Sequence, residues 1–291
     1  MKKMNRQKVL ILGARGLVGH VLFNNIARNT HFDCFGTVRG KNPNDTNFLH
    51  SSGAILPVDD LQNRGELEDI LVSTKPHIII NCLSLAKTDS ISRNALRALF
   101  VNVPHALSEI AATLSARVIN ISSDAVFSGT KGDQYNELNS TDATEPYGLA
   151  KKDGEVCAPH ILNLRASFVG YDPFKRRGLL EWFLAQEVCS LYSNYIFSGL
   201  PVPKFAEIIQ DFVLNNSELC GTYHIGSTPI SKLECLGLIA KTVNHRVKIN
   251  RDESVVINRS LDTKKFASAT GYEAQSWMEI QDYLCSTVKQ Y

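Results

Sequence analysis

The sequence lacks the spacings that hold metal ions or build disulfide frameworks. Its seven cysteines are odd in number and none form a C-x-x-C, and its eight histidines contain no H-x-x-x-H pair. These absences argue against a structural zinc site and against a disulfide-bonded secreted domain. We therefore expect no metal, and we expect most of the cysteines to be small buried side chains.

Long apolar runs and a strong charge of one sign are also missing. No stretch approaches the roughly 20 apolar residues of a membrane span, and the apolar run after the basic start is interrupted by Gly13 and Arg15, too early for a signal peptide. The formal net charge is only +2, which favours neither nucleic acid nor an anionic membrane as a partner. We expect a cytoplasmic protein with no nucleic-acid or membrane partner.

The first 165 residues alternate between short apolar runs and longer amphipathic ones. The pattern predicts strands at 8–12, 32–38, 54–58, 77–81, 117–122 and 161–165, and helices at 17–29, 66–74, 95–115 (one long helix or a broken one) and 147–158. Strands that are apolar throughout and alternate with helices indicate a parallel sheet covered on both faces. We therefore expect a doubly wound α/β fold.

After Arg165 the pattern becomes irregular. It predicts helices at 177–188, 203–216, 231–243 and 276–288, and a short strand at 221–226. We expect a dinucleotide-binding domain over 1–165 and a smaller, mostly helical substrate-binding cap over 166–291, with segments that return to the sheet.

A glycine pattern joins the first predicted strand to the first predicted helix. Gly13, Gly16 and Gly19 are spaced as G-x-x-G-x-x-G. Such glycines can mark a plain tight turn, but between a strand and a helix they allow the backbone to approach a pyrophosphate at the helix N-terminus. This position indicates dinucleotide binding.

The end of the second predicted strand bears on which dinucleotide is bound. An NAD site usually has a carboxylate there, whereas this chain has Arg39, and Arg15 lies inside the glycine loop. Guanidinium groups suit the 2′-phosphate of NADP, so we expect NADPH to be preferred and NADH to remain usable. Both arginines could instead be solvated loop charges. Asp60 could accept a hydrogen bond from the adenine amino group, or could be an ordinary loop aspartate.

Tyr147 and Lys151 are four residues apart, which places both on one face of the predicted helix. Alone, the pair fits an ordinary aromatic–lysine contact on a surface helix equally well. Ser123, which follows the strand at 117–122 and precedes Tyr147 by 24 residues, completes a Ser–Tyr–Lys set. In a doubly wound sheet, ligands bind beyond the carboxyl ends of the strands, where this serine lies.

These motifs together resemble the extended short-chain dehydrogenase/reductase family, and within it the dTDP-4-dehydrorhamnose reductases and related sugar-nucleotide reductases. The segments that carry the resemblance are GARGLVG, KPHIIIN, SSDAVFSG, EPYGLAKKDGE and LRASFVG, followed by GLPVPKFAEII, GTYHIG and RSLDTKKF. The resemblance covers nearly the whole chain. The three central motifs are specific because they occur in order and with the expected spacing.

The resemblance implies roles for individual residues. Tyr147 would donate the proton to the substrate carbonyl oxygen, Lys151 would hold the nicotinamide ribose and lower the pKa of Tyr147, and Ser123 would hydrogen-bond the same oxygen. The other implied contacts are Gly16, Leu17 and Val18 with the pyrophosphate, Asp60 and Leu61 with the adenine, Ser84, Leu85 and Ala86 with the cofactor, and Asp124 and Phe168 with the substrate.

Some positions depart from the family pattern or leave the substrate open. The run Cys82-Leu83-Ser84, Ala125 and Phe168 replace residues usual in the family, which puts the exact sugar in doubt but removes no reacting group. A substrate diphosphate calls for cations, and the candidates are Lys175, Arg176, Arg177, Lys204 and Arg259, with Arg259 preferred. Each could equally be a surface charge, and the role of the RSLD motif could be structural.

The hypothesis from the sequence is an NADPH-dependent reductase of a 4-keto-6-deoxy nucleotide sugar, of the kind used in polysaccharide biosynthesis. One alternative is an epimerase or dehydratase that keeps and recycles NAD. Another is a non-catalytic NADP-binding regulatory subunit. The oligomeric state is open, and a homodimer is one candidate.

Overall fold

The computed structural model describes residues 6–40, 49–50, 52–85, 91–174 and 178–284. The chain divides into two compact units. The first comprises Met1–Ile121, Asp153–Asn163 and Ile209–Gly221, and the second comprises Ser122–Lys152, Leu164–Ile208 and Thr222–Tyr291. The chain thus passes between the units several times. The sequence predicted a boundary near residue 165, with later segments that return to the sheet.

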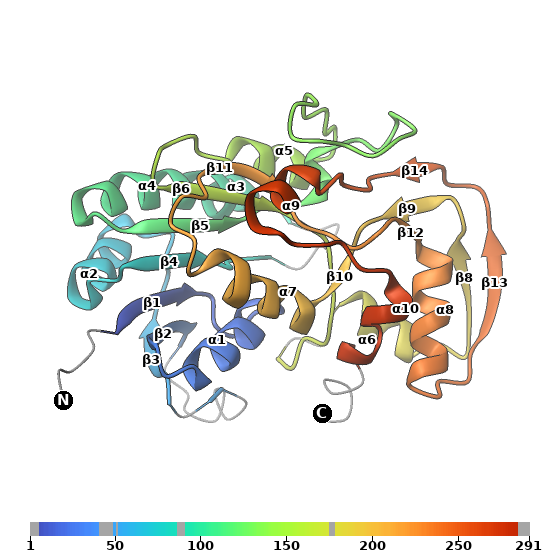
Figure 1. Ribbon diagram of the computed structural model, residues 1–291, viewed down its shortest axis with the longest axis horizontal. Coiled ribbons are helices and arrows are strands. Elements are labelled where there is room, and N and C mark those ends of the chain that lie inside the picture. The colour runs from blue at the N-terminus through green and yellow to red at the C-terminus, as the bar shows by residue number, and fades with distance from the viewer. Residues whose placement is uncertain (1–5, 41–48, 51, 86–90, 175–177, 285–291) are drawn as a thin grey trace. The chain divides into compact units, whose positions relative to one another are not determined.

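Seven strands form one sheet in the order β11-β6-β5-β4-β1-β2-β3 (Figure 1). The strands are β1 (Gln7–Leu12), β2 (Phe32–Arg39), β3 (Ala54–Val58), β4 (Ile78–Asn81), β5 (Arg117–Ile121), β6 (Ile161–Arg165) and β11 (Gly221–His224). β1 pairs in parallel with β2 and β4, β2 with β3, and β4 with β5. The predicted α/β fold with a parallel sheet is confirmed. The short strand expected at 221–226 is β11, at one edge of this sheet.

The central strands are apolar because they are covered on both faces. Every residue of β4 and β6 is buried, and so are the last four residues of β1 and of β5. A strand buried on both sides cannot alternate polar with apolar residues, which explains the continuous runs in the sequence.

Three buried asparagines interrupt this apolar interior as a row across β4, β5 and β6. The Asn81 Nδ2 donates to Asn120 Oδ1 at 3.0 Å, and the Asn120 Nδ2 donates to Asn163 Oδ1 at 3.0 Å. Asn120 Nδ2 also donates to the Gly154 carbonyl at 3.2 Å, and Asn163 Nδ2 to the Val156 carbonyl at 2.9 Å. The row therefore fixes the segment that follows the predicted Tyr–Lys helix.

The helices of the first unit connect the strands of the sheet. They are α1 (Gly19–Arg28), α2 (Arg64–Thr74), α3 (Arg93–Arg97), the π-helical turn η2 (Ala98–Asn102), α4 (Val103–Leu114) and the π-helical turn η4 (Ile209–Val213). The side chain of Asn63 caps α2, because its oxygen accepts from the backbone N–H groups of Gly65 and Glu66. The helical stretch expected at 95–115 runs without a gap from Arg93 to Leu114, with the π-helical turn η2 inside it. Pro104, which has no backbone donor, lies at the start of α4.

The second unit contains short helices and three small sheets. The helices are η3 (Asp124–Val126), α5 (Pro146–Asp153), α6 (Leu179–Leu184), α7 (Val202–Ile208), α8 (Lys232–Thr242), α9 (Lys264–Thr270) and α10 (Trp277–Ile280). The sheets pair β7 (Phe168–Val169) with β10 (Leu200–Pro201), β8 (Val188–Tyr192) with β13 (Lys248–Asp252), and β9 (Tyr195–Phe197) with β12 (Ile230–Ser231) and β14 (Ile257–Asn258).

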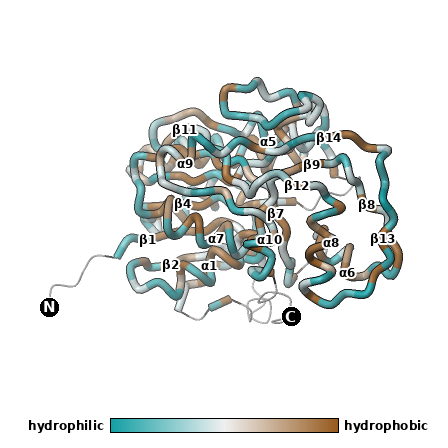
Figure 2. The backbone as a smooth tube through the Cα atoms, turned by 45° about the vertical axis from the view of Figure 1, so that its right-hand side comes forward, coloured by the Kyte–Doolittle hydropathy of each residue, from teal (hydrophilic) through white to brown (hydrophobic). Residues whose placement is uncertain are grey.

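Several of these strands were missed from the sequence. The helix expected at 177–188 ends at Leu184, and Val188 already begins β8. β8 alternates exposed and buried residues, but its partner β13 is mostly polar and appears mostly teal in Figure 2. A polar strand carries no hydrophobic period, so only the pairing reveals it.

The core of the second unit is aromatic and aliphatic. Trp277, Phe183 and Phe197 are buried together with Leu180 and Leu236, and the Trp277 indole donates to the Gly199 carbonyl at 2.8 Å. Burial with its N–H satisfied lets tryptophan contribute its full apolar area. Among the described residues, no helix is long and apolar enough to cross a membrane.

Candidate active site

The glycine loop lies at the carboxyl end of β1 and leads directly into α1. Gly13 has a φ of +84°, and its N–H donates to the Thr37 hydroxyl at 2.9 Å. A Cβ on Gly19 would collide with the Gly13 carbonyl oxygen, and the Gly16 N–H donates to that oxygen at 3.0 Å. Gly13 and Gly19 are therefore required by the turn itself, whereas a Cβ on Gly16 would make only an ordinary contact, 3.4 Å from the Gly13 carbonyl oxygen. The turn leaves a backbone cradle at the start of α1 that fits a pyrophosphate.

The predicted NADP residues meet at the end of β2. Arg15 Nη1 donates to the Arg39 carbonyl at 2.8 Å, and Arg39 Nη2 lies 3.5 Å from Asp60 Oδ1. The same Asp60 oxygen accepts from the Gln62 amide at 3.1 Å. The Arg39 side chain is 68% exposed, so its ion pair contributes little to stability and the guanidinium remains accessible to a ligand. The contacts of Asp60 with Arg39 and Gln62 were not expected from the sequence.

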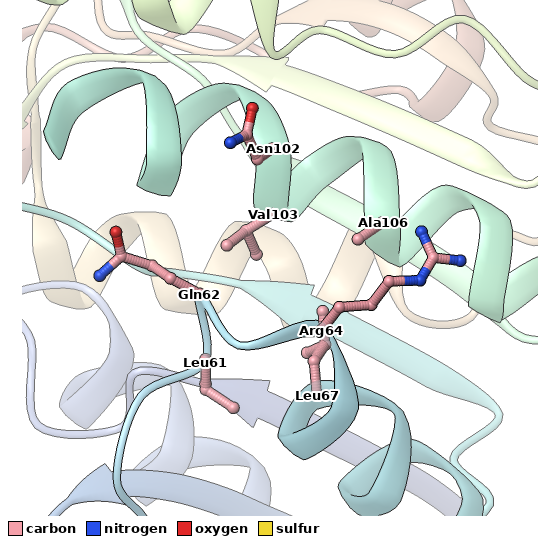
Figure 3. A pocket seen from close by; sticks show the side chains of 7 residues that line it. All are labelled: Leu61, Gln62, Arg64, Leu67, Asn102, Val103 and Ala106. Atoms are coloured by element: carbon pink, nitrogen blue, oxygen red, sulfur yellow. The ribbon is translucent and has the colours of Figure 1, made fainter. Parts of the chain in front are cut away.

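A cavity of about 160 Å³ lies beside Leu61 in the first unit. The helical segment of η2 and α4 lines one side of it with Asn102, Val103 and Ala106, and Figure 3 shows the Asn102 carboxamide turned away from the opposite side. The opposite side is formed by the loop before α2 and by α2 itself. Its lining residues there are Leu61, Gln62, Arg64 and Leu67. Leu61 is a predicted neighbour of adenine, whereas Asn102 was missed because η2 gives no motif that points to the cavity.

The segment after β4 packs against the glycine loop. A Cβ on Gly13 would lie 3.2 Å from the Leu83 side chain and 3.4 Å from the Cys82 carbonyl oxygen. Ser84 is exposed and Leu85 is half-buried. The third residue predicted here, Ala86, lies outside the described residues.

In the second unit, Ser123, Asp124 and Tyr147 form a polar cluster. Ser123 Oγ donates to Asp124 Oδ1 at 3.1 Å, accepts from the Ala125 N–H at 3.1 Å and is hydrogen-bonded with Tyr147. Ser123 and Asp124 are both only 8% exposed. Helix α5 can approach this closely because residue 148 is glycine, where a Cβ would collide with the Ala125 carbonyl oxygen.

The pKa of Tyr147 is raised above its ordinary value. Burial is the largest cause, the negative charge of Asp124 adds to it, and the hydrogen bond with Ser123 opposes it. The resemblance implied a lowered pKa, so the direction of this expectation is wrong for the structure as described. The expectation weighed the ammonium of Lys151 and left out the cost of ionising a phenol in a buried place beside a carboxylate. The phenol is therefore protonated at neutral pH.

The other predicted substrate residues have partners within the second unit. Phe168 packs edge to face on Phe205, with ring centroids 4.7 Å apart. Lys204 lies 2.5 Å from Glu207 Oε1 and donates to the Tyr283 hydroxyl at 3.5 Å. Burial lowers the pKa of Lys204, but Glu207 and Tyr283 outweigh it and the net shift is upward. Lys175, Arg176 and Arg177 lie outside the described residues.

Arg259 is buried, and its hydrogen-bond partners were not identified from the sequence. Its guanidinium contacts Glu145, Tyr195 and the Ser128 carbonyl. The pKa of Tyr195 is raised to about 12: burial is the largest cause, the negative charge of Asp124 adds to it, and Arg259 opposes it. Glu145 directly precedes the Pro-Tyr of α5, which is the one signal in the sequence that could have singled it out.

Two named relatives illustrate the similarity in sequence. The dTDP-4-dehydrorhamnose reductase of Aggregatibacter actinomycetemcomitans is 24% identical over 238 residues, which are 76% of this chain and 74% of that protein. The methionine adenosyltransferase 2 subunit beta of Danio rerio is 28% identical over 150 residues, which are 51% of this chain but only 42% of that protein.

Solved structures extend the similarity in fold over nearly the whole chain. The dTDP-4-dehydrorhamnose reductase of Bacillus anthracis, solved in complex with NADP, has a TM-score of 0.75 at 20% identity and covers 98% of this chain and 100% of its own. The Bordetella bronchiseptica enzyme WbmG, solved with NAD, has a TM-score of 0.81 at 16% identity and covers 100% and 96%.

The family model described as the RmlD substrate binding domain matches residues 7–169. This match includes the glycine loop, the Ser123–Asp124 segment and the Tyr147–Lys151 helix, and it spans more than half of the 291 residues. The protein therefore belongs to the RmlD family, within the extended short-chain dehydrogenases/reductases.

Proposed function

We propose that this protein is an NADPH-dependent reductase of a 4-keto-6-deoxy nucleotide sugar. The observation that carries the proposal is the buried Ser123–Tyr147 hydrogen bond, with Lys151 one turn further along α5. The proposal assigns cofactor binding to the glycine loop of the first unit and proton donation to the second. One relative matches 76% of this chain and is named dTDP-4-dehydrorhamnose reductase, and this name supports the substrate class.

A nicotinamide cofactor supplies the hydride in such a reaction. The protein supplies the proton and the orientation. Tyr147 donates its phenolic proton to the carbonyl oxygen as that oxygen gains negative charge, and Ser123 stabilises the same oxygen by a hydrogen bond. The raised pKa keeps Tyr147 in the protonated form that this role requires. Lys151 is assigned to the nicotinamide ribose.

The assignment of NADPH over NADH depends on Arg15 and Arg39. Arg39 ends β2, and the Arg15 guanidinium reaches it from the glycine loop and donates to the Arg39 carbonyl. A 2′-phosphate at this place would meet two guanidinium groups, while the Asp60 carboxylate is already engaged by Arg39 and Gln62. The cavity beside Leu61 is assigned to the adenine, with Asn102 as an additional polar neighbour.

A regulatory subunit is the second candidate function, because relatives named methionine adenosyltransferase 2 subunit beta match half of the chain. The presence of the reacting groups favours the enzyme, since a protein that only binds a partner has no use for Ser123 and Tyr147 in hydrogen-bond contact. Stable copurification with a larger enzyme, without NADPH oxidation on any keto sugar, would favour the subunit. An NAD-recycling epimerase or dehydratase would instead purify with tightly held NAD.

The experiment is a panel of 4-keto nucleotide sugars followed by NADPH absorbance at 340 nm, with the products identified by NMR. The proposal expects NADPH oxidation with at least one 4-keto-6-deoxy sugar and formation of the corresponding alcohol. Oxidation of no member of the panel would refute the reductase. Conversion of a sugar without net consumption of NADPH would point to the epimerase or dehydratase.

A further inference from the structure

Arg259 holds three separate segments of the second unit together. Its Nε donates to the Ser128 carbonyl at 3.3 Å, its Nη1 to the Tyr195 hydroxyl at 3.4 Å, and its Nη2 to Glu145 Oε1 at 3.4 Å. The residue is only 6% exposed. Gly129 has a φ of +86°, and a Cβ there would come within 3.0 Å of the Arg259 stem. The guanidinium is thus built into the fold rather than displayed on its surface.

Two of these segments carry the proposed reacting groups. The Glu145 carbonyl accepts from the Leu149 N–H at 3.0 Å, so Glu145 opens the first turn of α5, and Tyr147 lies within that turn. Ser128 lies on the same segment as Ser123, a few residues further along the chain. The same two segments are also joined by the Ala143 N–H, which donates to the Val126 carbonyl at 3.1 Å.

The groups around Arg259 stabilise its positive charge. Burial lowers its pKa, but Tyr195, Glu145 and Asp124 outweigh this and raise it. The Glu145 side chain is 58% exposed, whereas that of Arg259 is 7% exposed. The arginine is therefore the fixed member of the ion pair. A charged, buried guanidinium with three partners from three segments is suited to fix geometry, because its planar donors have fixed directions.

We propose that Arg259 is a positioning residue that acts through Glu145 to fix the first turn of α5, and with it the Tyr147 hydroxyl against Ser123. This inference rests on the proposed reductase function. It differs from the expectation that Arg259 binds the substrate diphosphate. The positioning role predicts that substitution of Arg259 lowers kcat and leaves diphosphate binding unchanged, whereas the binding role predicts that it weakens diphosphate binding.

The test compares wild type, Glu145→Gln, Arg259→Gln and the double variant, with NADPH and the best nucleotide sugar of the panel. Calorimetry with dTDP measures diphosphate binding separately from turnover. We expect Glu145→Gln to lower kcat about tenfold and Arg259→Gln to lower it at least as much, with KM for the nucleotide sugar within about twofold. We expect the double variant to be no slower than Arg259→Gln, and the dTDP affinity to be unchanged.

A different pattern would overturn the inference. If Arg259 contacts the diphosphate, Arg259→Gln raises KM and weakens dTDP binding about tenfold or more, while Glu145→Gln behaves as wild type. If Arg259→Gln does not fold, Arg259→Lys replaces it, and the same loss of kcat is expected because the single nitrogen of lysine cannot take the places of Nε, Nη1 and Nη2. A wild type that reduces no sugar would refute the proposed function itself, whereas an active wild type with unaffected Glu145→Gln would refute only this inference.

Discussion

Replacing Asn120 by alanine tests whether the buried amide row stabilises the sheet. The Asn120 side chain is 6% exposed and makes three hydrogen bonds, one each with Asn81, Asn163 and the Gly154 carbonyl. A net contribution of about 1 kcal/mol for each bond gives a loss of about 3 kcal/mol. With an unfolding entropy of about 2.1 cal/mol/K per residue, this corresponds to a fall in Tm of about 5 °C.

The assay is thermal unfolding followed by circular dichroism, with urea unfolding as a second measure of the free energy. The matched control is Asn250→Ala, which makes the same chemical change at an exposed position of strand β13. We expect the control to change stability by less than about 0.5 kcal/mol. Equal Tm values for the two variants would refute the reasoning, because they would mean that the amide row contributes nothing beyond a surface asparagine.

Three further changes probe the cofactor loop, the arginine at β2 and a buried histidine. Gly19→Ala places a methyl group against the Gly13 carbonyl oxygen, so we expect NADPH affinity, measured by fluorescence titration, to fall at least about tenfold. Arg39→Gln should weaken NADPH binding about tenfold and leave NADH binding unchanged, because one charge-assisted bond to phosphate is lost. Burial and then Arg165 lower the pKa of His224 to about 3. Neutral His224 therefore contributes its full share to the free energy of unfolding above pH 6.5, and this contribution is lost as the pH falls from 6.5 towards 3. In His224→Gln, the free energy of unfolding measured with urea should depend less steeply on pH in this range.

Each of these variants has a matched control in the chain. Gly237→Ala adds a methyl group in α8 where no atom lies within 4 Å, and it should bind NADPH as wild type does. Arg251→Gln removes another exposed, ion-paired arginine and should leave the cofactor preference intact. His31→Gln changes an exposed histidine and should leave the acid loss as steep as in wild type. A variant that behaves like its control contradicts the corresponding prediction.

The first unit was largely predictable from the sequence because its signals are local. Continuous apolar runs such as Ile78–Ile80 and Val9–Leu12 mark strands buried on both faces, and the spacing of the glycines marks the turn into α1. The second unit was less predictable. Strand β13 is mostly polar and is recognisable only by its pairing with β8, so neither hydrophobic periodicity nor strand propensity predicts it.

The same distinction applies to the site. Ser123 and Tyr147 could be found because the family motif fixes their spacing, and the structure places them in hydrogen-bond contact. The commitment of Arg259 to Glu145 depends on residues 114 positions apart, which no local pattern encodes. The raised pKa of Tyr147 was likewise missed, because the extent of its burial is a property of the packed fold.

The central claim is that Tyr147 is the proton donor of an NADPH-dependent reduction. The most direct measurement is the single-turnover rate of NADPH oxidation by wild type and Tyr147→Phe, with a 4-keto-6-deoxy nucleotide sugar in excess and NADPH binding checked by fluorescence. The account predicts that Tyr147→Phe folds, binds NADPH with unchanged affinity and loses turnover by at least about a hundredfold. Turnover near the wild-type rate, with the cofactor bound, would contradict it.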